Sequence, residues 1–312
     1  MLKFIIKGVL RDRSRSIFPV IVCAAGVFMV FFGGSFLEGS LDNFIGANAN
    51  FSTGHVKVVS YAYGQEKGGA ALELALETDE KFLTDLKKDY PDFHFTKRTN
   101  FGGLLDVPDT AGETRAQSPV GCIALDFLSK ESVEIKRLRL KDCLQAGKLP
   151  EKDTEVLLSQ HLAQRLEVQL KDRVTILSSS VHGASTAGNF IVSGFIRLGI
   201  PMLDRATVLL DVKGADYLLD MEDCTAEILG FNRSGFDEKQ IEKAAASFNK
   251  KHHSDDEYRP YMLTIMDQNN TREMLNKLNG ALGFMAFLFV FLMTLVLWNA
   301  GLISGIRRFS EV

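Results

Sequence analysis

The sequence lacks ionisable residues in two long runs, and this excludes a wholly soluble protein. No Asp, Glu, Lys, Arg or His occurs in the 22 residues of 16–37 or in the 29 residues of 278–306. A helix of about 20 uncharged apolar residues crosses the hydrocarbon core of a bilayer, which is roughly 30 Å thick. We therefore expect two transmembrane helices, at 16–37 and 278–306.

The motifs of common catalytic sites are missing as well. There is no phosphate-binding G-x-x-x-x-G-K-[ST] loop, no H-E-x-x-H and no G-x-S-x-G. The best candidate for a metal site is His252-His253 beside Asp255-Asp256-Glu257, but neighbouring residues rarely converge on one ion. We therefore expect a solvated loop there, and a chain that is not an enzyme and binds no metal or cofactor itself.

Cysteine is scarce, and basic charge does not dominate. Cys122, Cys143 and Cys224 lie between the two runs, so at most one disulfide forms among them, and their spacing leaves the pairing open. Residues 38–277 carry 29 Lys and Arg against 37 Asp and Glu, a net charge of −8. An acidic domain without a basic stripe argues against nucleic acid as a partner.

The flanking cations set the expected orientation. Cations precede the first run and follow the second: Lys3, Lys7, Arg11, Arg13, Arg15, Arg307 and Arg308. By the positive-inside rule both termini lie in the cytoplasm and 38–277 lies outside it. Ala47-Asn48-Ala49 resembles a signal-peptide cleavage site, but a run of 22 residues is longer than the apolar part of a signal peptide. The first run is therefore interpreted as an uncleaved anchor.

The first fifteen residues form a pattern of their own. Lys3, Lys7, Arg11 and Arg15 follow at steps of four, which places them on one helical face. Residues 1–15 are therefore predicted to be a cytoplasmic amphipathic helix at the membrane surface. The alternative is a plain basic leader that only sets the topology.

Between the two runs we predict an α+β domain in two parts. Alternating apolar residues predict strands at 55–61, 94–106, 206–212 and 226–231, and helical spacing predicts helices at 79–90, 215–219 and 237–249. The intervening stretch has short strands at 120–125, 155–158, 173–178 and 190–198, divided by Gly and Ser turns. We expect a β-α subdomain from 51–114 and 202–266, with a β-rich subdomain of 115–201 inserted into it.

The last part of the exterior block is predicted to be a helical stalk. Residues 267–277 are polar and run without proline into the second apolar run. Leu275, Leu278 and Leu282 follow at spacings of three and four, which is the seam of a short coiled coil. We expect one continuous helix from Asp267 into the second span.

Several motifs in this order resemble one family of membrane proteins. They are Lys7-Gly8-Val9-Leu10-Arg11-Asp12 before the first span, Thr53-Gly54-His55-Val56-Lys57-Val58, Gly147-Lys148-Leu149-Pro150, Glu155-Val156-Leu157-Leu158-Ser159, Phe190-Ile191-Val192-Ser193-Gly194-Phe195-Ile196 and Arg307-Arg308-Phe309-Ser310-Glu311-Val312. Together they are similar to ABC transporter permeases of the MacB and LolC/LolE type, the FtsX-like permease family. Lys171 stands where that family usually has glycine.

The resemblance implies a function, a location and partners. A permease of this type lies in the bacterial inner membrane with a periplasmic MacB-like core domain. It works as a homodimer or heterodimer with a cytoplasmic ATPase subunit that binds ATP and magnesium, and a periplasmic partner protein is a further expectation. Such a transporter exports or extracts an envelope substrate such as a lipoprotein, a lipid-like molecule, a peptide or a drug. Arg308 and Glu311, just after the second span, are then the expected ATPase contact.

The resemblance also covers only the first part of such a permease. Family members of this layout have four spans and a coupling helix after the second one, so we expect this chain to be an N-terminal part. Two other functions stay open at this point. One is an FtsX-like scaffold that activates a cell-wall hydrolase without transport, and the other is a two-span sensor with an exterior ligand domain.

Overall fold

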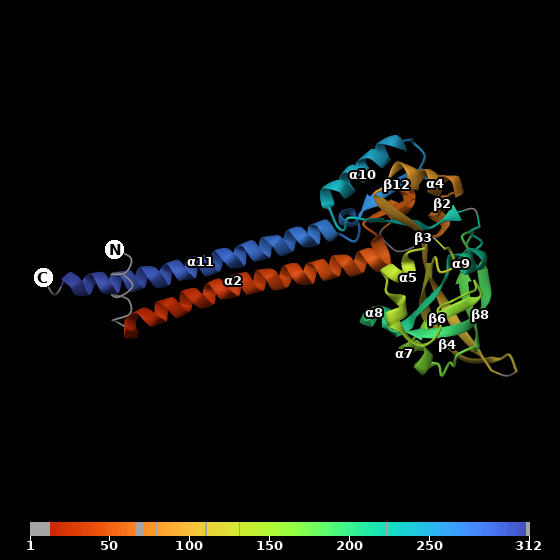
Figure 1. Cartoon of the computed structure of the whole chain (residues 1–312), viewed down its shortest axis with the longest axis horizontal. Coiled ribbons are helices and arrows are strands. Elements are labelled where there is room, and N and C mark those ends of the chain that lie inside the picture. The colour runs from red at the N-terminus through yellow and green to blue at the C-terminus, as the bar shows by residue number, and fades with distance from the viewer. Residues whose placement is uncertain are drawn as a thin grey trace. The chain divides into compact units, whose positions relative to one another are not determined.

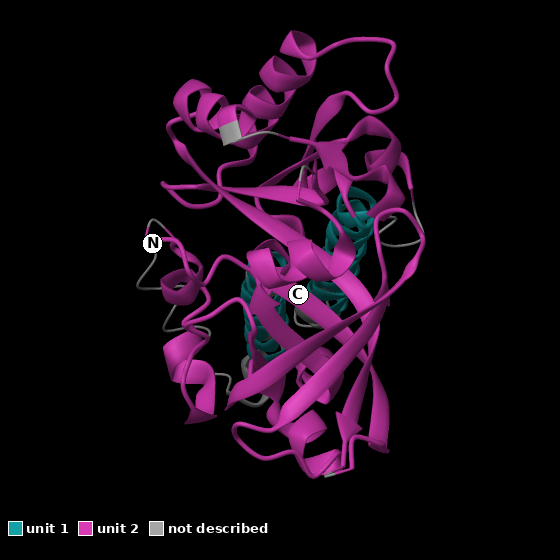
Figure 2. Ribbon diagram, turned by 90° about the vertical axis from the view of Figure 1, so that its right-hand side faces the viewer, with its two compact units in different colours: residues 1–47, 269–312 teal, residues 48–268 magenta. Residues whose placement is uncertain are grey.

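The computed structural model divides the chain into two compact units, which are described separately below (Figure 2). It describes residues 13–66, 72–78, 80–109, 111–130, 132–222 and 224–309. Unit 1 consists of Met1–Ala47 with Asn269–Val312, and unit 2 of Asn48–Gln268. The amphipathic helix expected at 1–15 lies outside the described residues except for its last three positions, which begin helix α2 (Arg13–Asn48).

Unit 1 contains two long helices with apolar surfaces, α2 and α11 (Thr271–Phe309) (Figure 1). Their stretches Val20–Thr53 and Thr271–Asn299 are long and apolar enough to cross a membrane. Large apolar side chains point outward, and Phe31 and Trp298 expose 72% and 68% of their surface. Gly26 is buried beside Met293, whose Sδ would lie 2.9 Å from a Cβ at position 26, so a small residue there lets the helices approach closely.

The first helix extends beyond its expected end at Leu37. Gly33, Gly34 and Gly39 lie inside α2, and no atom lies within 4 Å of the place where their Cβ would be. A glycine costs a helix about 1 kcal/mol relative to alanine, which weakens the helix without breaking it. The chain stays helical through Asn48 and continues as the π-helical turn η1 (Ala49–Thr53).

The second helix begins later than predicted. Residues Ile265–Asp267 form a separate 3₁₀ turn, η3, and Asn269 and Asn270 have φ values of 53° and 55°. Two left-handed residues in a row interrupt a right-handed helix, so α11 starts at Thr271 and not at Asp267. The three leucines of the expected seam, Leu275, Leu278 and Leu282, are half-buried along α11.

Unit 2 is built around one mixed sheet. The strand order is β12-β1-β11-β3-β4-β9-β6-β8-β5, with β7 pairing both β3 and β8. The bounds of these strands are β1 (Val56–Ser60), β3 (Phe93–Pro108), β4 (Thr114–Leu125), β5 (Leu144–Gly147), β6 (Glu155–Ser159), β7 (Arg173–Ser179), β8 (Ser185–Ile196), β9 (Thr207–Asp211), β11 (Glu227–Asn232) and β12 (Pro260–Thr264). A separate two-stranded sheet joins β2 (Leu76–Glu77) to β10 (Cys224–Thr225).

The first half of β3 belongs to an antiparallel sheet covered by two helices. It pairs β11, which pairs β1, which pairs β12. The amphipathic helices α4 (Glu80–Asp89) and α10 (Glu238–Lys251) cover one face, where Leu86, Ile241 and Phe248 are buried against the strands. The sequence predicted these two helices, β1 and β11, but it missed β12.

The second half of β3 belongs to a closed ring of strands. The pairs β3–β4, β4–β9, β9–β6, β6–β8, β8–β7 and β7–β3 complete the circle. Alternating residues fill the interior, including Leu105, Val156 and Leu210, which expose none of their surface. A closed barrel has no free strand edges, so this part of the domain is protected from edge-to-edge association.

The remaining helices are short and cover the barrel or connect its strands. They are α3 (Tyr61–Gln65), η2 (Leu72–Leu74), α5 (Glu134–Arg137), α6 (Leu140–Cys143), α7 (Gln160–Arg165), α8 (Pro201–Ala206) and α9 (Val212–Leu219). The outward residues Leu157 and Leu209 are buried with Leu138, next to α5, and Leu140 of α6. The barrel is therefore covered on the outside as well as filled on the inside.

The predicted subdomain boundary at 201/202 needs correction. Strand β9 and helix α9 were expected in the β-α subdomain, but β9 is a barrel strand and Leu218 and Leu219 of α9 are buried in the barrel core. The reason is that β9 lies parallel to β4 and antiparallel to β6, pairings that alternation within one strand cannot reveal. The inserted part therefore runs from the middle of β3 past the end of α9.

Candidate functional site

We call the sheet formed by β12, β1, β11 and the first half of β3 the small sheet. Charged side chains are buried on its face opposite α4 and α10. Lys57 of β1, Glu227 of β11 and Arg98 of β3 lie on neighbouring strands, and Glu227 and Arg98 are directly opposite in register. They expose 7%, 4% and 0% of their surface. The Lys57 Nζ donates to Glu227 Oε1 at 2.7 Å, and the Tyr63 hydroxyl donates to the same oxygen at 2.8 Å. Burial and the Glu227 carboxylate both raise the pKa of Tyr63.

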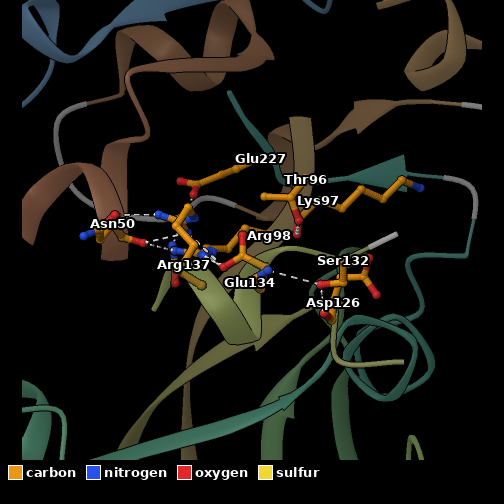
Figure 3. A network of polar contacts seen from close by, with 10 residues as sticks. Asn50, Thr96, Lys97, Arg98, Asp126, Ser132, Glu134, Arg137 and Glu227 are labelled. Carbon is orange, nitrogen blue, oxygen red and sulfur yellow. Dashed lines mark hydrogen bonds and ion pairs between the residues drawn. The ribbon is translucent and has the colours of Figure 1, made fainter. Parts of the chain in front are cut away.

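Arg98 is the centre of a second group of contacts, which we call the arginine cluster: Asn50, Arg98, Glu134 and Arg137 (Figure 3). Arg98 Nη2 donates to Glu134 Oε2 at 2.6 Å, and Arg137 Nη2 donates to the same oxygen at 2.9 Å. Arg98 Nη1 donates to the Asn50 carbonyl at 2.7 Å, and Arg137 Nη1 donates to Asn50 Oδ1 at 2.7 Å. Two guanidinium groups therefore share one carboxylate and hold one residue of η1.

The arginine cluster is buried, and burial shifts the pKa values of both of its arginines. Burial lowers the pKa of Arg98 and lowers that of Arg137 to about 10, while the Glu134 carboxylate acts in the opposite direction. Arg137 therefore stays protonated at neutral pH. Its guanidinium carbon lies 3.5 Å from the centre of the Phe231 ring, a cation–π contact that further fixes the side chain.

The contacts fasten the first residues of unit 2 to its last ones. Gly54 has a φ of 61°, which favours glycine, and it turns the chain from η1 into β1. A Cβ there would lie 2.5 Å from the Val56 carbonyl oxygen. The Ile265 amide donates to the His55 carbonyl at 3.1 Å, and Gln268 Nε2 donates to the Thr53 carbonyl at 3.4 Å. Residues that precede β1 and residues that follow β12 thus form one junction.

His55 is part of this junction, and its imidazole ring is neutral. The Asn232 amide donates to His55 Nδ1 at 3.0 Å, so the proton of the neutral imidazole lies on Nε2. Burial, and then the Arg137 charge, keep the pKa of His55 below its ordinary 6.5. The ring contacts Phe231 and Phe236 edge-on, which makes it a packing residue at neutral pH.

The residues that the sequence singled out do not come together here. Arg308 lies in the last turns of α11, where only the backbone is described, and Glu311 lies outside the described residues. Leu275, Leu278 and Leu282 belong to unit 1. Among the described residues no group of three His, Cys, Asp or Glu side chains is placed to hold a metal ion. His252 instead stacks on Phe248, with ring centres 4.2 Å apart.

Sequence reasoning missed the arginine cluster, although one signal was present. Glu227 stands between Ala226 and Ile228 in an otherwise apolar strand, and a charge inside such a strand needs a buried partner. Cys122 lies in the barrel core, where burial raises its pKa to about 12. No disulfide involves Cys122 or Cys143 in the structure.

A second side chain with a shifted pKa, Asp216, lies on α9. Burial, and then the carboxylates of Asp211 and Glu222, raise the pKa of Asp216 to about 7, while Lys97 acts in the opposite direction. The unfolded chain would ionise this carboxyl near its ordinary 3.8. The folded chain therefore binds the proton more tightly, and the contribution of Asp216 to stability declines as the pH rises from about 4 to about 7.

Comparisons with known proteins found a similar structure but no similar sequence. No family model matches the chain, and no curated protein matches it. The solved structures include the periplasmic region of MacB from Actinobacillus actinomycetemcomitans, with a TM-score of 0.45 and 11% sequence identity, over 72% of this chain and 95% of that one. A likeness of this extent carries no function with it.

The arginine cluster predicts coupled effects on stability. Breaking a buried ion pair from one side costs about 3–5 kcal/mol, because it leaves a buried charge without its partner. We expect Glu134→Gln, which leaves two guanidinium groups without a carboxylate, to lower the free energy of unfolding by that amount. Arg98→Met should lower it less, because Arg137 still pairs with Glu134, and the double variant should lose about 1–3 kcal/mol less than the sum of the two. Denaturant titration of the full chain in detergent measures this.

The exposed pair Arg139 and Asp142, joined at 2.9 Å, is the control for this experiment. Arg139→Met and Asp142→Asn should each change stability by about 0–1 kcal/mol, because water screens an exposed pair. Additive losses at Arg98 and Glu134, or losses no larger than those of the control pair, would contradict the assignment.

Asp216 predicts a pH-dependent effect of opposite sign. Asp216→Asn removes a carboxyl that must ionise in a buried place, so it should stabilise the chain by roughly 4 kcal/mol near pH 8 and by less than about 1 kcal/mol near pH 4. Thermal unfolding across this pH range checks the trend. Exposed Asp142→Asn should give a difference that does not grow with pH, and an equally flat profile for Asp216→Asn would refute the raised pKa.

Proposed function

We propose that this chain is a permease subunit of an ABC transporter of the MacB and LolC/LolE type. In this proposal α2 and α11 cross the bacterial inner membrane and unit 2 lies in the periplasm. The ordered series of sequence motifs supports the family, and the apolar surfaces of the two helices support the membrane. Lysine and arginine before the first apolar run and after the second support cytoplasmic termini.

One observation carries the proposal: the arginine cluster and its neighbours fasten the first and last segments of unit 2 into one junction. Residues from η1, β3 and α5 meet at Asn50, while β1 and β12 lie side by side. A displacement that enters at either segment would therefore reach the same edge of the sheet. From there β11 and β3 lead directly into the barrel.

Such a junction suits a protein that transmits motion. A transmitting element must hold its shape, and buried charge-assisted hydrogen bonds have a narrower geometry than apolar contacts. We infer that ATP hydrolysis in a separate cytoplasmic subunit moves the helices and that unit 2 follows. The substrate is then an envelope molecule such as a lipoprotein, a lipid-like molecule, a peptide or a drug, handled by two permease chains together.

The test is whether an ATPase subunit accompanies the chain. The tagged full chain is purified from its native membranes in mild detergent and treated with a photoreactive ATP analogue. We expect a separate polypeptide to be labelled. Arg308→Ala combined with Glu311→Ala should reduce its recovery by about tenfold, which corresponds to 1.4 kcal/mol of binding free energy.

Arg139→Ala combined with Asp142→Ala is the matched control, since it removes the same two charge types from an exposed pair in unit 2. It should leave recovery of the labelled subunit unchanged. A preparation without any ATP-binding polypeptide would contradict the transporter and favour a two-span sensor. Recovery of a labelled ATPase together with a cell-wall hydrolase would favour the non-transporting scaffold.

A further inference from the structure

A groove in unit 2 lies between the barrel and the small sheet. Its volume is about 1250 Å³, and its walls come from the segment η2–β2, the residues that follow α9 and the loop between α10 and β12. Pockets that enclose drug-sized molecules usually have roughly 300–1,000 Å³. This groove is larger, and it is formed by parts of the chain that belong to both hydrophobic cores.

Carboxylates dominate the described lining of the groove. The five acidic residues are Glu73, Glu77, Asp220, Glu222 and Asp256, against the two cations Lys251 and Arg259. Both cations already have partners. The Lys251 ammonium pairs with Asp89, which lies outside the lining, and the Arg259 guanidinium lies 3.7 Å from the centre of the Tyr61 ring. The charge of the lining is therefore not neutralised from within.

The carboxylates, in contrast, are available to a ligand. Glu73, Glu77 and Glu222 are exposed, and the described residues provide none of them with an ion pair. Asp220 lies 3.8 Å from His182, a pair that is ionic only when the histidine is protonated.

The groove also has apolar surface between its charges. Val181 is half-buried in its wall, and Tyr258 exposes 53% of its surface. A small inorganic cation would make no favourable contact with this apolar surface. A chain that carries both basic and apolar side chains would use the charged and the apolar lining together.

We propose that this groove binds a basic peptide segment of a partner protein. Lysine or arginine side chains of the segment pair with Glu73, Glu77 and Glu222, and apolar side chains between them contact Val181 and Tyr258. Because the walls come from both cores, the bound segment bridges the barrel and the small sheet. This proposal concerns unit 2 alone and does not depend on the proposed transport function.

The test uses a fluorescein-labelled peptide of alternating lysine and valine and the full chain in detergent. Fluorescence anisotropy should show saturable binding that weakens as salt is raised, because exposed charges are screened over about 10 Å at 0.1 M salt. The combined variant Glu73→Gln, Glu77→Gln and Glu222→Gln should bind at least about tenfold more weakly, with an unchanged circular dichroism spectrum.

The matched control is Glu113→Gln, Glu151→Gln and Glu167→Gln, which removes three exposed carboxylates outside the groove. It should bind the peptide as the unaltered chain does. Equal binding by both triple variants, or equal binding of a glutamate–valine peptide, would overturn the proposal. Binding of spermidine or calcium, measured by isothermal titration calorimetry, without any binding of the basic peptide would overturn the peptide as the ligand.

Discussion

The buried ion pair between Arg98 and Glu134 is the interaction on which the rest of unit 2 depends. Arg98 comes from the strand that both hydrophobic cores share, and Glu134 from a four-residue helix that has little stability of its own. Their contact at 2.6 Å brings Arg137 to the same carboxylate, and the two guanidinium groups then hold Asn50. Without the arginine cluster α5 and η1 lose the side-chain hydrogen bonds that Arg98, Glu134 and Arg137 provide.

This arrangement gives a charged cluster a structural purpose that an apolar cluster would serve less well. Apolar side chains can slide past one another at small cost, whereas a guanidinium group that donates from two nitrogens, as Arg98 does to Glu134 and Asn50, fixes both distance and direction. Burying the cluster costs desolvation free energy, and the same desolvation lowers the pKa of both arginines. Strand β3 then extends the fixed geometry, because its first half pairs β11 and its second half closes the barrel.

Patterns within single segments predicted the helices and strands, but not which strands pair or which side chains meet across the fold. Alternation in 55–61 and 226–231 and helical spacing in 79–90 and 237–249 were sufficient for β1, β11, α4 and α10. The end of the charge-free run at Leu37 did not mark the end of α2, which continues to Asn48, and the left-handed Asn269-Asn270 pair that delays α11 left no clear signal. The closed barrel and the Arg98–Glu134 pair depend on contacts between segments far apart in sequence. The link to an ATPase through Arg308 and Glu311 stays a prediction.

Hydrogen exchange of the full chain tests most directly whether the arginine cluster fastens η1 to the domain. The account predicts that the amides of Ala49–Thr53 are protected in the unaltered chain. In Arg137→Met, which keeps the Arg98–Glu134 pair, they should exchange at least about tenfold faster, while the amides of β6 and β9 keep their protection. Unchanged exchange in η1, or a uniform increase throughout unit 2, would contradict the account.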